Sequence, residues 1–314
     1  MNSLRTTILA AAVTGAVLAP AAVAQAAPTT LAVEQAPTRV AAWNDTVVWS
    51  HFDSATRTYS LVKSVNGGPP TAVGIEPRGG SPFDVDLGSS RSGATTAVYT
   101  RDGDIYRLNL ASGAEVKVQG LSSPVLAERD PTIQRGQIAF IRRNGGRDEL
   151  RLGATSRRSK LLVRKRSIVS AELGARHIAY VESVPSGFRA LHLRVRNLST
   201  GADRLVYKAT SGGANAAGVT RPSYMSDPEG FMWARTNNGS GRGNRLIRYT
   251  LRGSKLSYAQ GSPFYNATAW VNPTLGAVTA SSLTGEESQG ACTDTGVQYC
   301  KVELTGAPRF NLRP

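Results

Sequence analysis

The chain has 314 residues, a formal net charge of +15, 32 glycines and 16 prolines. Glycine and proline interrupt it too often for long helices, which excludes a helical architecture. The excess of basic residues, mostly arginine, predicts a surface that attracts polyanions in a salt-sensitive way. An arginine- and alanine-rich composition also arises from a GC-rich genome, so the charge alone assigns no function.

The first 26 residues have the pattern of a cleaved export signal. Arg5 supplies a positive charge, an apolar stretch of small residues follows over 8–23, and Ala24-Gln25-Ala26 offers a small-x-small cleavage site. The stretch is short and contains Pro20, which disfavours a membrane anchor. No later segment is long and apolar enough to cross a bilayer. We therefore expect a mature chain that is secreted or held in the periplasm or cell envelope.

Short apolar strands that end in an aromatic residue recur along the mature chain. The aromatic residues are Trp49, Tyr99, Phe140, Tyr180 and Trp233, which are separated by 50, 41, 40 and 53 positions. A weaker copy of the strand ends 46 positions later, at Thr279. This spacing is that of a four-stranded propeller blade. Burial between blades is the expected role of these rings, with stacking of Trp49 or Trp233 on a sugar as the alternative.

Each aromatic strand is followed by an alternating strand and a turn, as in 105–110 and then Ala111-Ser112-Gly113. The sequence therefore predicts an all-β fold, a single β-propeller over 36–314 with about six four-stranded blades. The expected blades are 36–78, 82–120, 128–165, 167–210, 219–262 and 265–313. Residues 27–35 form an N-terminal segment that is either disordered or a closing strand for the last blade.

Two segments resemble the repeats of a known family. Arg101-Asp102-Gly103-Asp104 and the strand after it, ending in Leu110-Ala111-Ser112-Gly113, are similar to the turn, strand and ending of TolB-type, WD40-like (PD40) propeller repeats of exported bacterial proteins. Residues 221–233 resemble the proline-serine-aromatic entry of the same repeat. The resemblance implies the fold; because members of this family differ widely in function, it implies little about activity.

The chain has two cysteines, Cys292 and Cys300. In an exported protein, two cysteines this close usually form a local disulfide. Asp294, Thr295 and Gly296 lie between them and suit a turn, so we expect the bridge to staple a hairpin in the last blade.

No catalytic motif is present in the sequence. The three histidines, His51, His177 and His192, are isolated, and there is no nucleophile elbow, P-loop or dinucleotide fingerprint. Neither a cofactor nor a metal site is expected, since Asp102 and Asp104 alone fall short of a calcium shell. Carboxylates do recur in the predicted turns, where a funnel can gather them: Asp84, Asp86, Asp102, Asp104, Asp130, Glu182, Asp227 and Glu229.

Basic residues are concentrated over 142–166. In a propeller, the turn after the second strand of each blade and the links between blades share one face. The predicted blades place seven arginines on this face: Arg57, Arg101, Arg142, Arg143, Arg147, Arg235 and Arg242. Guanidinium groups around a funnel mouth hold carboxylate or phosphate well, whereas an ordinary solvated surface is the other interpretation. Aromatic residues do not alternate with the basic run, so specific nucleic-acid binding is not expected.

Two functions of different classes follow. The first is a monomeric, non-catalytic exported propeller that binds a protein or an anionic cell-envelope polymer through its loop face. The alternative is a carbohydrate-active or lactone hydrolase that uses funnel carboxylates such as Asp84, Asp102 and Asp130.

Overall fold

The structure is a computed structural model that describes ten segments of the chain: residues 29–154, 158–184, 190–209, 219–223, 229–237, 242–252, 255–260, 267–272, 276–282 and 300–304. Side chains are described for residues 29–154, 158–184, 192–206, 278 and 300–304. The signal sequence predicted over residues 1–26 lies outside these segments.

The described residues form six antiparallel sheets of four strands each, numbered here from the first sheet in the chain. Sheet 1 contains β2 (Val40–Trp43), β3 (Thr46–Asp53), β4 (Thr58–Val65) and β5 (Thr71–Gly79). Sheet 2 contains β6 (Asp86–Ser89), β7 (Thr95–Arg101), β8 (Asp104–Asn109) and β9 (Glu115–Lys117). Sheet 3 contains β10 (Glu128–Gln134), β11 (Gln137–Asn144), β12 (Arg147–Ala154) and β13 (Lys160–Lys165).

The remaining sheets continue the same order. Sheet 4 contains β14 (Ile168–Leu173), β15 (His177–Val184), β16 (Ala190–Asn197) and β17 (Asp203–Ala209). Sheet 5 contains β18 (Val219–Ser223), β19 (Glu229–Asn237), β20 (Arg242–Arg252) and β21 (Lys255–Gln260). Sheet 6 contains β22 (Ala267–Asn272), β23 (Gly276–Ser282), β24 (Cys300–Leu304) and, at its outer edge, β1 (Thr29–Glu34).

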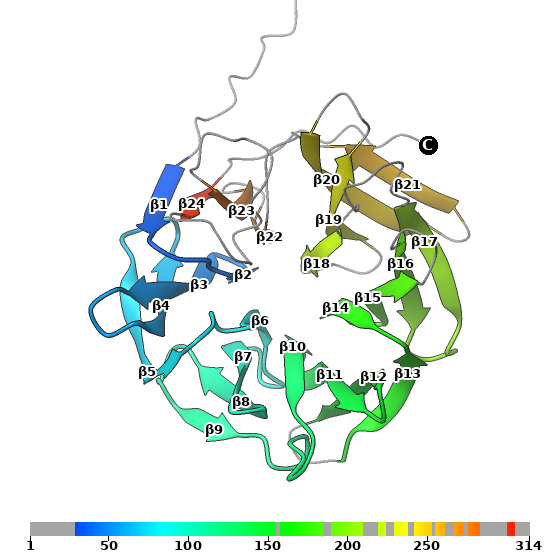
Figure 1. Ribbon diagram of the computed structural model, residues 1–314, viewed down its shortest axis with the longest axis horizontal. Helices are drawn as coiled ribbons and strands as arrows, with labels where there is room; N and C mark the ends of the chain where they lie inside the picture. Colours follow the sequence, from blue (N-terminus) through cyan, green and yellow to red (C-terminus); the bar gives the residue numbers. More distant parts are fainter. Residues whose placement is uncertain are drawn as a thin grey trace, which may run out of the picture.

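The sheets follow one another around a common centre, with the first strand of each nearest the centre and the last at the rim (Figure 1). The prediction of an all-β chain built from four-stranded sheets is confirmed, and the arrangement is propeller-like. Strand β1 pairs antiparallel with β24, with Glu34 opposite Cys300. The N-terminal segment therefore supplies a strand to the last sheet, one of the two outcomes that the sequence left open.

The core lies between neighbouring sheets. Trp49, Tyr99, Phe140 and Tyr180 occupy equivalent places on the second strands β3, β7, β11 and β15, and all four side chains are fully buried. Phe83, in the link before β6, packs edge-on against Tyr99 with ring centroids 5.3 Å apart. The predicted burial of these four rings is confirmed, and Trp49 has no exposed surface with which to stack on a sugar. Trp233 lies on β19, outside the residues with described side chains.

The aromatic strand that marks each repeat is the second strand of its sheet. The first strand is short and carries a weaker hydrophobic pattern, as in Asp86-Leu87-Gly88-Ser89 of β6. The hydrophobic pattern of β6 is weak because β6 contacts β10, the first strand of the next sheet, through polar groups. The amide of Ile133 in β10 donates to Asp86 Oδ2 in β6 at 2.9 Å.

Candidate functional site

One end of the sheets, here called the loop face, carries the links between sheets together with the turns that follow the second strands. Antiparallel pairing places the start of the first strand, the end of the second, the start of the third and the end of the fourth at the same end. In sheet 3 this is seen in register, with Glu128 opposite Arg142, Arg142 opposite Glu149, and Glu149 opposite Arg164. The loop face is therefore the face to which the sequence analysis assigned the seven candidate arginines.

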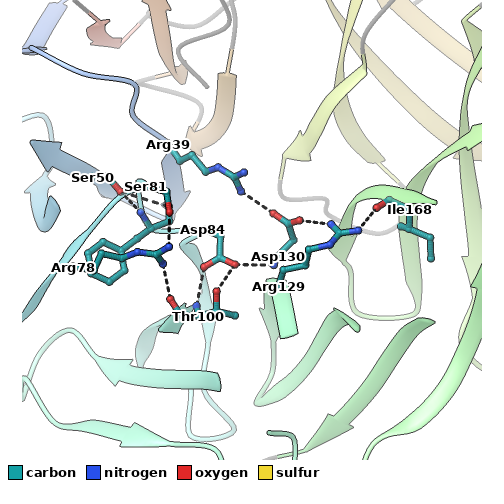
Figure 2. Close-up of polar contacts among 10 residues, drawn as sticks. Arg39, Ser50, Arg78, Ser81, Asp84, Thr100, Arg129, Asp130 and Ile168 are labelled. Carbon is teal, nitrogen blue, oxygen red and sulfur yellow. Dashed lines mark hydrogen bonds and ion pairs between the residues drawn. The ribbon is translucent and has the colours of Figure 1, made fainter. Parts of the chain in front are cut away.

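Near the centre of this face, Asp84 is enclosed by hydrogen-bond donors (Figure 2). Its Oδ1 accepts the amide of Thr100 at 2.7 Å, and its Oδ2 accepts both the hydroxyl of Thr100 at 2.7 Å and the amide of Asp130 at 2.8 Å. Thr100 is the penultimate residue of the second strand of sheet 2, and Asp130 lies in the first strand of sheet 3. One buried carboxylate thus joins two neighbouring sheets.

Asp130 is the centre of a chain of ion pairs that crosses several sheets (Figure 2). Its Oδ1 accepts Arg39 Nη1 from the link before sheet 1, and its Oδ2 accepts Arg129 Nη1, both at 2.7 Å. Arg129 Nη2 also donates to Asp148 at 2.9 Å and to the carbonyl of Ile168 in sheet 4 at 2.6 Å. Charge-assisted bonds of this kind hold the arginine heads in fixed positions.

The backbone of Asp130 is left-handed, with a φ of 46°. It lies at a register shift in β10, between Arg129 and Thr132, and it precedes Pro131. Aspartate tolerates this conformation better than most residues. The bulge turns the Asp130 amide toward Asp84 and its carboxylate toward the two arginines, so the local irregularity positions the network.

The five predicted arginines whose side chains the structure describes divide into two groups. Arg101 and Arg142 serve the fold: Arg101 binds both oxygens of Glu115 at 3.1 Å, and Arg142 donates to Glu128 and to the carbonyl of Leu121, each at 2.7 Å. Burial raises the pKa of Glu128, although the Arg142 guanidinium and the Ser123 amide lower it. Both guanidinium groups are largely covered, with side chains only 13% and 14% exposed.

The second group points into solvent. Arg57 lies exposed in the turn between β3 and β4, and Arg147 is exposed at the start of β12 with no ion pair to any described residue. Arg143 has a side chain 56% exposed, and its Nη1 donates to Asp148 at 3.0 Å. Arg235 lies near the end of β19 and Arg242 begins β20, both at the loop face, and their side chains lie outside the described ones.

The structure adds basic residues that the sequence did not single out for the face. Arg39 and Arg129 are about one-third exposed near the centre, and Arg164 and Arg166 are exposed beside Arg143 at the end of sheet 3. Their shared position depends on register and on links between sheets, which a single sequence does not reveal. The only available signal was the run of basic residues over 142–166, which contains two of these four.

Acidic residues at the loop end of sheet 3 lie beneath the basic ones. Each has a side chain that is 10% exposed or less and bonded to an arginine: Glu128, Asp130, Asp148 and Glu149. Exposed cations therefore form the outer layer, here called the arginine surface and defined as Arg129, Arg143, Arg147, Arg164 and Arg166. An outer layer of one sign attracts ions of the opposite sign.

Most other predicted carboxylates are also engaged. Asp86 accepts the Ile133 amide, Asp104 pairs with Lys117 at 2.5 Å, and buried Glu182 pairs with Lys165 at 2.7 Å. Asp102 lies exposed in the β7–β8 turn with a φ of 53°, the position of a turn former. Asp227 and the side chain of Glu229 lie outside the described part of the structure.

Cys300 begins β24 and is buried, whereas Cys292 lies outside the described residues, so the disulfide stays a prediction. Within the described segments, no group of three or more His, Cys, Asp or Glu side chains is placed to hold a metal ion. The same segments contain no helix with the length and hydropathy that a membrane crossing requires.

Comparison with solved structures finds propeller-type proteins. A puromycin-hydrolyzing peptidase from Mycobacterium tuberculosis matches 82% of this chain at 11% identity with a TM-score of 0.52. The fold is propeller-like. The chain covers 53% of that peptidase, about half its length, and at this identity the likeness shows the fold alone.

Two oligogalacturonate lyases match with TM-scores of 0.47. One, in complex with manganese, is 10% identical over 83% of this chain and 86% of its own. The other, from Vibrio parahaemolyticus, is 7% identical over 88% of this chain and 98% of its own. No family model matches the sequence, and no curated protein is significantly similar. A propeller-like fold by itself is compatible with both catalytic and binding functions.

Proposed function

We propose that this chain is an exported, non-catalytic propeller of six blades that binds an anionic macromolecule through its loop face. In this proposal, sheets 1 to 6 are the blades, residues 1–26 are the cleaved signal, and β1 closes the ring by completing the last blade. The pairing of β1 with β24 supports the closure. The start of β1 at Thr29, two residues beyond the first residue of the predicted mature chain, is compatible with removal of the signal.

The observation that carries the proposal is the separation of charge at the end of sheet 3. Arg143, Arg147 and Arg166 are exposed, whereas Asp148, which binds Arg143 and Arg129, has a side chain only 2% exposed. A partner approaching this face meets guanidinium groups before any carboxylate. Such a surface favours association with anions and loses strength as salt increases.

The buried acids also orient the arginines. Asp148 fixes one Nη atom of Arg129 and one of Arg143, while the side chains remain 39% and 56% exposed. A planar guanidinium held in this way presents its outer N–H groups to carboxylate or phosphate oxygens with little further loss of rotamer freedom. The arrangement suits recognition of a polymer or protein that carries repeated negative charges.

The test is a titration of the mature chain with polyglutamate, polygalacturonate and polyphosphate at low and at physiological salt. We expect binding that weakens with salt and falls about tenfold in the triple variant Arg143→Ala, Arg147→Ala, Arg166→Ala, because rim charges control attraction and salt dependence. The matched control is Arg91→Ala, Arg158→Ala, Lys160→Ala, which removes three exposed charges at the opposite end of the sheets. Equal losses in both triple variants, or no binding to any polymer, would contradict the proposal.

A propeller hydrolase that uses Asp84, Asp102 and Asp130 is the alternative that the fold also accommodates. General acid-base chemistry needs a carboxylate oxygen within reach of the substrate. Asp84 and Asp130 each accept protein donors on both oxygens, which favours a structural role for them. Turnover of a glycoside or lactone substrate that is lost on alanine substitution at one of the three positions would replace the binding proposal with this one.

A further inference from the structure

The link between β9 and β10, residues 118–127, lies on the loop face and is longer than the links at 80–85 and 166–167. Its hydrogen bonds fix its course. Arg142 Nη2 donates to the carbonyl of Leu121 at 2.7 Å, the amide of Ile105 donates to Ser122 Oγ at 3.1 Å, and the amide of Ser123 donates to Glu128 at 3.2 Å. Leu121 is fully buried and anchors the link between sheets 2 and 3.

The tip of this link is apolar and stands in solvent. Val125 is 83% exposed, the highest value among the large hydrophobic residues that the structure describes, and Pro124 and Ala127 are exposed beside it. Ser123 Oγ accepts the amides of Val125 and Leu126 at 3.3 and 3.1 Å, which closes the tip into a turn. Single exposed valines are common on proteins; this one is held outward by a turn whose amides are satisfied.

The β9–β10 link is joined to the arginine surface through Arg142 and Glu128, which precede Arg143 and Arg129 in the chain. Arg142 binds the link through Leu121, and the next residue, Arg143, belongs to the arginine surface. At the other end of the link, Glu128 pairs with Arg142 and precedes Arg129. A partner on this face therefore meets a fixed apolar side chain and a row of oriented cations together.

We infer that the partner of the loop face is an acidic protein segment that carries an apolar side chain. The inference rests on the proposed function and adds a partner class to it. A purely charged polymer pairs with the arginines and leaves Val125 exposed to water. An acidic segment with an apolar residue pairs with the arginines and also buries Val125. A pre-ordered tip also costs little conformational entropy when it is covered.

The experiment compares two polymers on the full mature chain: polyglutamate, and a glutamate–leucine copolymer that carries the same number of glutamates. We expect the copolymer to bind about tenfold more tightly, the effect of burying roughly two methyl groups. Val125→Ser should remove this difference without weakening polyglutamate binding. The matched control is Val116→Ser, which removes an exposed valine from the rim strand β9, and it should preserve the difference.

The outcomes separate the inference from the proposed function. Equal binding of the two polymers, a preference that survives Val125→Ser, or tighter binding of polyphosphate than of the copolymer would overturn the inference. Each of these results leaves the proposed function in place as long as the arginine triple variant weakens every polymer. If that variant weakens none, the proposed function fails, whatever Val125 contributes.

Discussion

Asp84 illustrates how a residue at the loop face can resemble a catalytic group and serve the fold. Its side chain is buried, and its two oxygens accept three donors from two sheets. Two of these donors are backbone amides, which lose their partner if the carboxylate is removed. Buried donors without an acceptor destabilise a protein by about 1–3 kcal/mol each.

Asp84→Asn should therefore lower the free energy of unfolding by about 2 kcal/mol, because the amide group has one acceptor oxygen where the carboxylate has two. Asp102→Asn is the control, since Asp102 is exposed and asparagine tolerates the same left-handed turn. Its expected change is below about 0.5 kcal/mol. Chemical denaturation of both variants measures the difference, and equal stability of the two would show that Asp84 does not join the sheets.

At the scale of the strand, side chains of the preceding sheet satisfy backbone amides along the unpaired edges of two first strands, β10 with the turn after it and β14. Asp86 accepts the Ile133 amide, Ser89 Oγ accepts the Arg135 amide, and Thr132 Oγ1 accepts the Leu173 amide. Unpaired strand edges favour aggregation. For sheets 3 and 4, side chains of the preceding sheet therefore take the place of a neighbouring strand.

Gly88 tests how closely these first strands approach. A Cβ at Gly88 would lie 2.1 Å from the backbone oxygen of Ile133, whereas a Cβ at Gly74 in β5 meets nothing within 4 Å. Gly88→Ala should destabilise the protein by at least about 2 kcal/mol through forced separation of sheets 2 and 3. Gly74→Ala should be neutral or slightly stabilising. A neutral Gly88→Ala in thermal or chemical unfolding would contradict the close approach of β6 and β10.

The sequence predicted the second strands of sheets 1 to 4 well, because each contains a large aromatic ring that is buried between sheets: Trp49, Tyr99, Phe140 and Tyr180. It did not reveal what those rings bind. The hydroxyl of Tyr180 donates to Asp203 at 2.5 Å, and Trp49 Nε1 donates to Glu34 at 2.7 Å. These partners lie on the fourth strand of the same sheet and on β1 respectively, so the pairs follow from the three-dimensional order of strands and not from local spacing.

The candidate site was predicted only in part, because its side-chain pairs also depend on the three-dimensional order of strands. The candidate arginines could be assigned to the loop face from the predicted blade boundaries, because this assignment needs only the order of strands within each blade. Whether each arginine is covered depends on its acid: Arg142 is held against buried Glu128, whereas Arg147 has no described acidic partner. Asp84 and Asp130 were predicted only as turn or funnel carboxylates. The hydrogen bond between them joins residues 46 positions apart, so the local sequence does not indicate it.

At the scale of the whole molecule, charge and topology act together. A chain with a net charge of +15 repels itself, and the loop end of sheet 3 reduces this cost by placing Asp148 and Glu149 beneath Arg143 and Arg164. At this end Arg143, Arg147 and Arg166 face outward over the buried acids, whereas Arg91, Arg158 and Lys160 are exposed at the opposite end. The proposed binding surface is therefore defined by this layering of exposed arginines over buried acids and not by the net charge alone.

The most direct test of the binding account is hydrogen exchange of the mature chain with and without saturating polyglutamate. The account predicts slowed exchange in peptides covering 118–130 and 142–148, which carry the apolar tip and most of the arginine surface. It predicts no change in the turns at 90–94 and 135–136, which lie at the opposite end of sheets 2 and 3. Protection spread over both ends, or confined to the opposite end, would contradict it.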